Sequence, residues 1–164
     1  EIEKTPPPEP EQKKPSAPKN RVFKTAFLQK GKSLYSLAIK NYGKANPTMY
    51  DLILNANPGI TDIRSIPDNR KIRLPAITPE SFIQETGGSY SLFIGTFETH
   101  NLAAQCAAKI SGLGKNTIIK AQKFSPRDTW YRLTAGSFVT RDEALDAANL
   151  LIKQGVIFIP GQLS

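Results

Sequence analysis

The chain has 164 residues and a formal net charge of +8, a length that fits one ordinary domain or two small ones. Its single cysteine excludes a framework of disulfides within the chain. No apolar run reaches the roughly 18 residues that a membrane-spanning helix needs.

The positive charge is concentrated in residues 21–77, which carry ten Lys or Arg against three Asp. Such a segment favours a polyanionic partner, namely nucleic acid, anionic lipid or an acidic cell-wall polymer. The alternative is an ordinary solvated basic face. Charge therefore narrows the class of partner without choosing one.

Residues 1–21 are predicted to form a disordered linker, because residues 1–20 contain six prolines among Glu, Lys, Gln and Ser. This composition cannot bury a core and gives a stiff, extended chain. Linkers of this kind join a domain to something upstream, so we expect a membrane anchor before Glu1.

Residues 22–76 are predicted to form a first compact domain. Ser33 and the Asn46-Pro47 pair are start signals for helices, and Gly43 is a stop signal. The expected elements are a strand within 22–28, helices from 34 to 42 and from 47 to 56, and a strand at 71–75.

Residues 77–88 are predicted to be a connector, residues 89–160 a second domain and residues 161–164 a tail. The second domain contains a repeat 41 residues apart, since Tyr90-Ser-Leu-Phe-Ile-Gly-Thr-Phe97 parallels Tyr131-Arg-Leu-Thr-Ala-Gly-Ser-Phe138. The expected elements are strands at 90–97, 117–124, 129–135 and 156–159, with helices at 100–113 and 141–154. This β-α-β-β-α-β order predicts an α+β fold, in which a four-stranded antiparallel sheet has two helices on one face and leaves the other face open.

Residues suited to catalysis are few. Cys106 falls in an apolar helical series and is interpreted as a small core residue. The acidic residues around 142–146 are interpreted as helix capping and solvation. We therefore expect no enzyme activity, no catalytic residue, no metal site and no cofactor.

Two turns of the first domain are expected to lie near each other and to form a shallow groove. Backbone amides, a hydroxyl and aliphatic side chains would line it, which suits an extended polar polymer. The candidate site residues are Gly31, Lys32, Ser33, Leu34, Asn57, Pro58, Gly59 and Ile60.

Residues 24–75 resemble a LysM domain. The turn Gly31-Lys-Ser-Leu34 stands where that family has Gly-Asp-Thr-Leu, and Asn41-Tyr42-Gly43 stands at the end of its first helix. Asn57-Pro58 and the closing Lys71-Ile-Arg-Leu-Pro75 also match. The resemblance implies binding of N-acetylglucosamine-containing glycans between the two turns.

Alternation along the strands of the second domain sorts side chains onto two faces. The face without helices is expected to expose aromatic, cationic and polar groups, a platform for sugar rings or nucleobases. Its candidate site residues are Phe93, Lys120, Gln122, Trp130, Arg132 and Thr134. The alternative is that Phe93 or Trp130 packs under the connector or the tail.

Residues 89–160 resemble a SPOR domain, because Ile94-Gly-Thr-Phe97 and Ala135-Gly-Ser-Phe138 are similar to the two halves of that family. The resemblance implies binding of peptidoglycan glycan strands that lack stem peptides, through the open sheet.

The leading hypothesis is a monomeric, periplasmic, inner-membrane-anchored protein that binds peptidoglycan through two tandem modules and locates an envelope or division protein at the wall. One alternative is single-stranded RNA binding through an open sheet like that of an RRM domain, although nucleic acid is not the expected partner. The other is a protein–protein module of an envelope machine.

Overall fold

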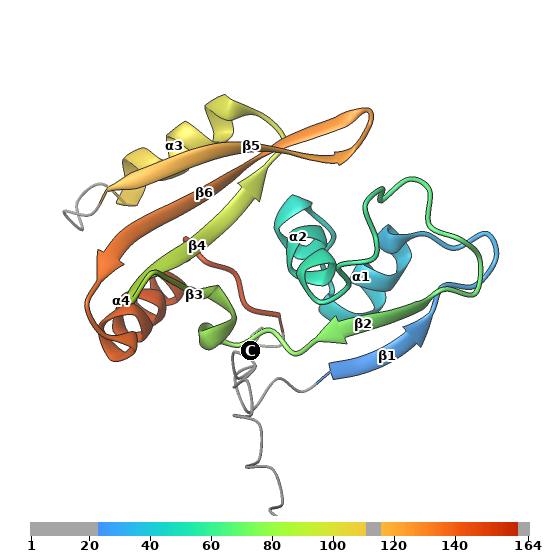
Figure 1. Ribbon diagram of the computed structural model, residues 1–164, viewed down its shortest axis with the longest axis horizontal. Helices are drawn as coiled ribbons and strands as arrows, with labels where there is room; N and C mark the ends of the chain where they lie inside the picture. The colour runs from blue at the N-terminus through green and yellow to red at the C-terminus, as the bar shows by residue number, and fades with distance from the viewer. Residues whose placement is uncertain (1–22, 111–115, 161–164) are drawn as a thin grey trace, which may run out of the picture.

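The computed structural model describes residues 23–110 and 116–160. The predicted linker at 1–21 and tail at 161–164 lie outside these residues. The first unit consists of β1 (Phe23–Phe27), α1 (Leu34–Tyr42), α2 (Pro47–Asn55) and β2 (Lys71–Pro75), in the expected order (Figure 1). β1 and β2 pair as a two-stranded antiparallel ribbon.

Local sequence signals explain where the helices of the first unit begin and end. The Ser33 hydroxyl accepts a hydrogen bond from the Ser36 amide at 3.3 Å, and the Asn46 side chain accepts one from the Met49 amide at 2.9 Å. These caps satisfy amides that the first turn of a helix leaves free. Gly43 ends α1 in the left-handed conformation, with φ of 70°.

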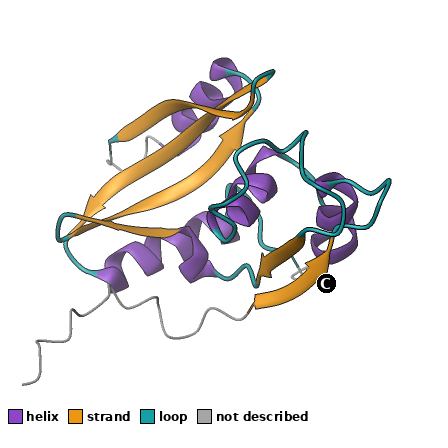
Figure 2. Cartoon of the chain, turned by 45° about the vertical axis from the view of Figure 1, so that its right-hand side comes forward, coloured by secondary structure: helices purple, strands orange, loops and turns teal. Residues whose placement is uncertain are grey.

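The second unit is built on a four-stranded antiparallel sheet in the order β3-β4-β6-β5. Its elements are the short 3-10 helix η1 (Pro79–Phe82), β3 (Ile83–Thr86), β4 (Ser89–Phe97), α3 (His100–Ile110), β5 (Thr117–Ser125), β6 (Asp128–Phe138) and α4 (Arg141–Lys153). Helices α3 and α4 lie against one face of the sheet (Figures 1 and 2). The expected α+β class and four-stranded antiparallel sheet are confirmed.

The strand at one edge of this sheet differs from the expectation. β3 comes from the predicted connector and pairs with β4 across the Gly87-Gly88 turn, whose positive φ values of 58° and 86° suit a two-residue hairpin. Residues 156–159, predicted as a strand, are not one. Ile157 and Ile159 are buried instead, so their apolar character serves packing rather than pairing.

The sheet face opposite α3 and α4 is not open, because α2 of the first unit lies on it (Figure 1). Buried apolar side chains of both units belong to one continuous core. Gly95 on β4 permits the close approach, since a Cβ there would lie 3.1 Å from the Thr48 hydroxyl on α2. The two units are therefore packed into one body (Figure 2).

Candidate functional site

A buried polar cluster joins α2 to the sheet. The Asp51 carboxylate, 1 % exposed, accepts hydrogen bonds from the Thr96 hydroxyl at 2.5 Å and from Arg132 Nε at 2.8 Å. Arg132 Nη2 also pairs with the other Asp51 oxygen. A buried carboxylate needs such partners because its desolvation is costly. The cluster therefore fixes how α2 sits on the sheet.

One turn earlier on α2, the Thr48 hydroxyl makes a second polar contact with β4. It donates to the Thr96 carbonyl at 3.2 Å and accepts from the Thr96 amide at 3.0 Å. The backbone of Thr96 is thus bonded to a side chain of the first unit. A helix of one unit is held against a strand of the other by side-chain and main-chain groups together.

An aromatic row crosses the boundary between the two units. The Tyr50 and Trp130 rings stack with centroids 5.8 Å apart and planes 19° apart. Behind Trp130 lies the buried Phe124 ring, at 4.8 Å between centroids. Burial raises the pKa of the Tyr50 hydroxyl, and the neighbouring Tyr35 and Glu98 raise it further, so Tyr50 stays neutral at physiological pH.

The loop after α2 is tied to the hairpin of β5 and β6. The Ile63 amide donates to the Phe124 carbonyl at 2.9 Å. The Arg64 guanidinium donates twice to the Asp128 carboxylate, at 2.5 Å and 2.9 Å. Hydrogen bonds from Arg64 and from the Ser125 hydroxyl lower the pKa of Asp128 to about 2.

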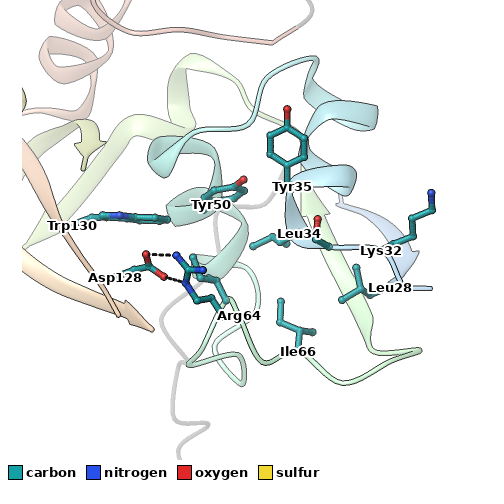
Figure 3. Close-up of a pocket in the computed structure, with 11 residues that line it drawn as sticks. Leu28, Lys32, Leu34, Tyr35, Tyr50, Arg64, Ile66, Asp128 and Trp130 are labelled. Atoms are coloured by element: carbon teal, nitrogen blue, oxygen red, sulfur yellow. Dashed lines mark hydrogen bonds and ion pairs between the residues drawn. The ribbon is translucent and has the colours of Figure 1, made fainter. Parts of the chain in front are cut away.

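A hollow of about 450 Å³ lies on the surface beside the Tyr50–Trp130 stack and the Arg64–Asp128 pair, as Figure 3 shows. The first unit contributes side chains from β1–α1, from α2 and from the following loop, and the second unit contributes two from β6. The lining residues are Leu28, Lys32, Ser33, Leu34, Tyr35, Tyr50, Ile63, Arg64, Ile66, Asp128 and Trp130. A second hollow of about 310 Å³ also spans both units and is lined by Asp51, Leu54, Asn55, Pro58, Ile60, Thr61, Gln122, Lys123 and Phe124.

The structure divides the predicted site of the first unit. Lys32, Ser33 and Leu34 line the larger hollow, whereas Pro58 and Ile60 line the smaller one. Gly31 adopts φ of 78° in the first turn, and Gly59 is exposed in the second.

Asn57 has a structural task. Its side-chain amide nitrogen donates to the Ile53 and Arg73 carbonyls at 2.6 and 2.7 Å, and its oxygen accepts from the Arg73 amide at 2.8 Å. The side chain, 8 % exposed, thus ties the end of α2 to β2.

The predicted site of the second unit is placed on the expected face but is largely covered. Phe93 was expected to be exposed and is instead 2 % exposed, because it stacks on Phe82 of η1, with centroids 6.0 Å apart. This matches the alternative in which Phe93 packs under the connector. The Arg132 guanidinium lies 5.8 Å from the Phe93 centroid.

The other predicted residues of that face differ in access. Thr134 is half-buried and pairs with Phe93 in the sheet register. Lys120 and Gln122 on β5 are exposed, and Gln122 borders the smaller hollow. Trp130 is half-buried and lines the larger one.

Several residues of this region were not singled out from the sequence. Tyr35, Tyr50, Arg64 and Asp128 are not among the candidate site residues predicted from the sequence, although all four line the larger hollow. Asp51 carried the one available signal, because an acidic residue between Tyr50 and Leu52 interrupts an apolar series. That signal indicates that Asp51 has a buried polar partner, but it does not identify the partner as Arg132.

Within the described residues, no group of three or more His, Cys, Asp or Glu side chains could hold a metal ion. Over the same residues, no helix has the length and apolarity to cross a membrane. Cys106 is half-buried, and burial raises the pKa of its thiol, so it stays protonated at neutral pH.

A comparison with family models matches residues 86–157 to the model described as SPOR domain. A SPOR domain is therefore found in this part of the chain, from β3 through α4 to the buried segment that follows it. SPOR domains are non-catalytic peptidoglycan-binding modules, found in periplasmic proteins of the cell envelope and of division. Neither the curated proteins nor the solved structures gave a match.

Proposed function

We propose that this chain binds the glycan strands of peptidoglycan without catalysis and so locates an envelope, division or secretion protein at the cell wall or septum. The observation that carries the proposal is the SPOR domain at residues 86–157. The first unit is proposed as a LysM-like contributor to the same binding, supported by its β-α-α-β order. The compartment proposed is the periplasm, with an inner-membrane anchor upstream.

Of the glycan-binding residues predicted from the sequence, we retain those that border a surface hollow. Lys32, Ser33, Leu34 and Trp130 border the larger hollow, and Pro58, Ile60 and Gln122 border the smaller one. Direct contact between Phe93 and a glycan would require η1 and α2 to move. Phe82 of η1 stacks on Phe93, and α2 packs against β4, the strand that carries Phe93.

Co-sedimentation with purified sacculi tests the proposal. The chain should pellet with sacculi, and more of it should pellet after an amidase has removed the stem peptides. Because the chain carries a net charge of +8, a basic protein without glycan-binding activity is the control, at about 0.15 M and at higher salt. Failure to pellet at any salt concentration would contradict the proposal.

A further inference from the structure

We propose that the two units form a single composite site for a short N-acetylhexosamine oligosaccharide in the larger hollow, with one wall from each unit. The inference deepens the proposed function and rests on it. It replaces two independent modules with one site that exists only when both units are present.

The size and position of the hollow support a ligand site. Its volume of about 450 Å³ lies within the range of roughly 300–1,000 Å³ that small-molecule sites occupy. Tyr35 and Tyr50 come from the two helices of the first unit, and Trp130 comes from β6 of the second (Figure 3). Each unit therefore supplies aromatic surface to the same space.

The aromatic wall is held in place before any ligand arrives. Trp130 packs on the buried Phe124 ring and stacks with Tyr50, so its orientation is fixed from two sides. Tyr35, on the wall from the first unit, is 58 % exposed and so has ring surface available to a ligand. Preformed aromatic surfaces bind the apolar faces of sugar rings with little loss of side-chain entropy.

The rest of the lining combines aliphatic groups with three charged side chains, Lys32, Arg64 and Asp128. Leu28, Leu34 and Ile66 give methyl-rich surface suited to acetamido methyl groups. The Arg64 cation is paired with Asp128 inside the hollow at 2.9 Å, so a phosphate gains little from it. Lys32 leaves one net positive charge in the hollow, whereas binding to a nucleic-acid backbone needs several cations for its successive phosphates. The mostly aromatic and aliphatic lining therefore favours an amide-bearing sugar.

The walls are joined by contacts that belong to neither unit alone. The bond between the Ile63 amide and the Phe124 carbonyl, and the ion pair of Arg64 with Asp128, hold the loop against the hairpin. Separation of the units would remove one wall entirely. Loss of binding on separation should therefore exceed the loss of avidity expected for two linked modules.

Titration of the full chain with chitotetraose, the tetramer of N-acetylglucosamine, tests the inference. Trp130 is the only tryptophan of the chain, so its fluorescence reports on the hollow directly. Calorimetry should give one oligosaccharide per chain. Tyr35→Ala removes the aromatic ring of one wall and Trp130→Phe reduces the aromatic area of the other. Each should weaken binding about three- to tenfold when the affinity is measured by calorimetry.

Phe27→Ala is the matched control, because Phe27 is 61 % exposed and lies outside the hollow. Its affinity for chitotetraose should equal that of the unmodified chain. Circular dichroism of each variant checks that the fold is retained.

The outcomes separate the inference from the proposed function. If the chain binds sacculi but neither Tyr35→Ala nor Trp130→Phe weakens chitotetraose binding, the composite site is wrong. The proposed peptidoglycan binding would still stand. A stoichiometry of two would have the same two consequences. Chitotetraose binding that depends on both walls, without binding of sacculi, would support the site and overturn the peptidoglycan proposal. Displacement of chitotetraose by oligouridine would reassign the hollow to single-stranded RNA.

Discussion

Two glycines that hold equivalent places in the sequence repeat have different structural tasks. Gly136 adopts φ of +88°, and a Cβ there would lie 2.4 Å from a ring carbon of Phe138. Gly95 has no positive φ and instead leaves room for Thr48 of α2. Equivalent glycines in the repeat therefore have different surroundings, a helix of the first unit beside Gly95 and the Phe138 ring beside Gly136.

Gly136→Ala should destabilise the protein by at least about 1 kcal/mol, because the substitution combines an unfavourable φ with a steric clash. The measurement is urea unfolding followed by tryptophan fluorescence. Gly88→Ala is the matched control, with a similar φ of +86° and nothing within 4 Å of the added Cβ. Equal losses for the two variants would show that the clash with Phe138 has no effect.

At the scale of elements, the β5–β6 hairpin is connected to the loop after α2 by the pair of Arg64 and Asp128. The folded pKa of Asp128, about 2, lies below the unfolded value near 3.9. A carboxyl with a lowered folded pKa stabilises the fold above its unfolded pKa and loses that effect as the pH falls through the folded pKa. The connection should therefore weaken between about pH 4 and about pH 2.

Comparison with Asp128→Asn measures this effect. The unmodified chain should have the higher urea midpoint at pH 6, and the difference should close as the pH approaches 2. The difference is expected to be small, because Arg64 is well exposed to solvent. A difference that stays constant from pH 6 to pH 2 would exclude titration of Asp128 as its source.

The sequence predicted the elements better than their contacts. Alternation correctly placed Phe93, Trp130 and Arg132 on the face away from α3 and α4, since side chains on a strand must alternate. It could not show that α2 covers this face, because docking between units leaves no periodic signal. Only Asp51, acidic within an apolar helix, marked the contact.

The edge of the sheet shows a second limit. Gly87-Gly88 suits both a flexible connector and a two-residue hairpin, and the β3–β4 pairing decides for the hairpin. Residues 156–159 have strong β propensity, yet β3 holds the edge beside β4. The β propensity of residues 156–159 was therefore outweighed by the pairing of β3 with β4, which the tight turn at Gly87-Gly88 brings together.

At the scale of the whole molecule, the two units share one core and one buried ion pair. Asp51 accepts from both Thr96 and Arg132, so it holds the first unit on the sheet of the second. Breaking such a cluster leaves a cation without its partner, which costs more than the intact pair contributes.

Asp51→Asn should lower the free energy of unfolding by about 1–3 kcal/mol, because an amide nitrogen would then face a hydrogen-bond donor. Chemical unfolding by urea is the measurement. The control is Asp146→Asn on the exposed side of α4, which should change the stability by no more than about 0.5 kcal/mol. An unchanged midpoint for Asp51→Asn would mean that the cluster does not hold the units together.

The narrow space beside Gly95 limits how freely this architecture can be recombined. A foreign domain in place of the first unit would have to offer a short hydroxyl side chain opposite the glycine and a carboxylate three residues later, as Thr48 and Asp51 do. A residue larger than glycine at position 95 would press on Thr48, because even a Cβ there would lie 3.1 Å from the Thr48 hydroxyl. Exchange of either unit for a foreign domain should therefore fail without a matching change in the other unit.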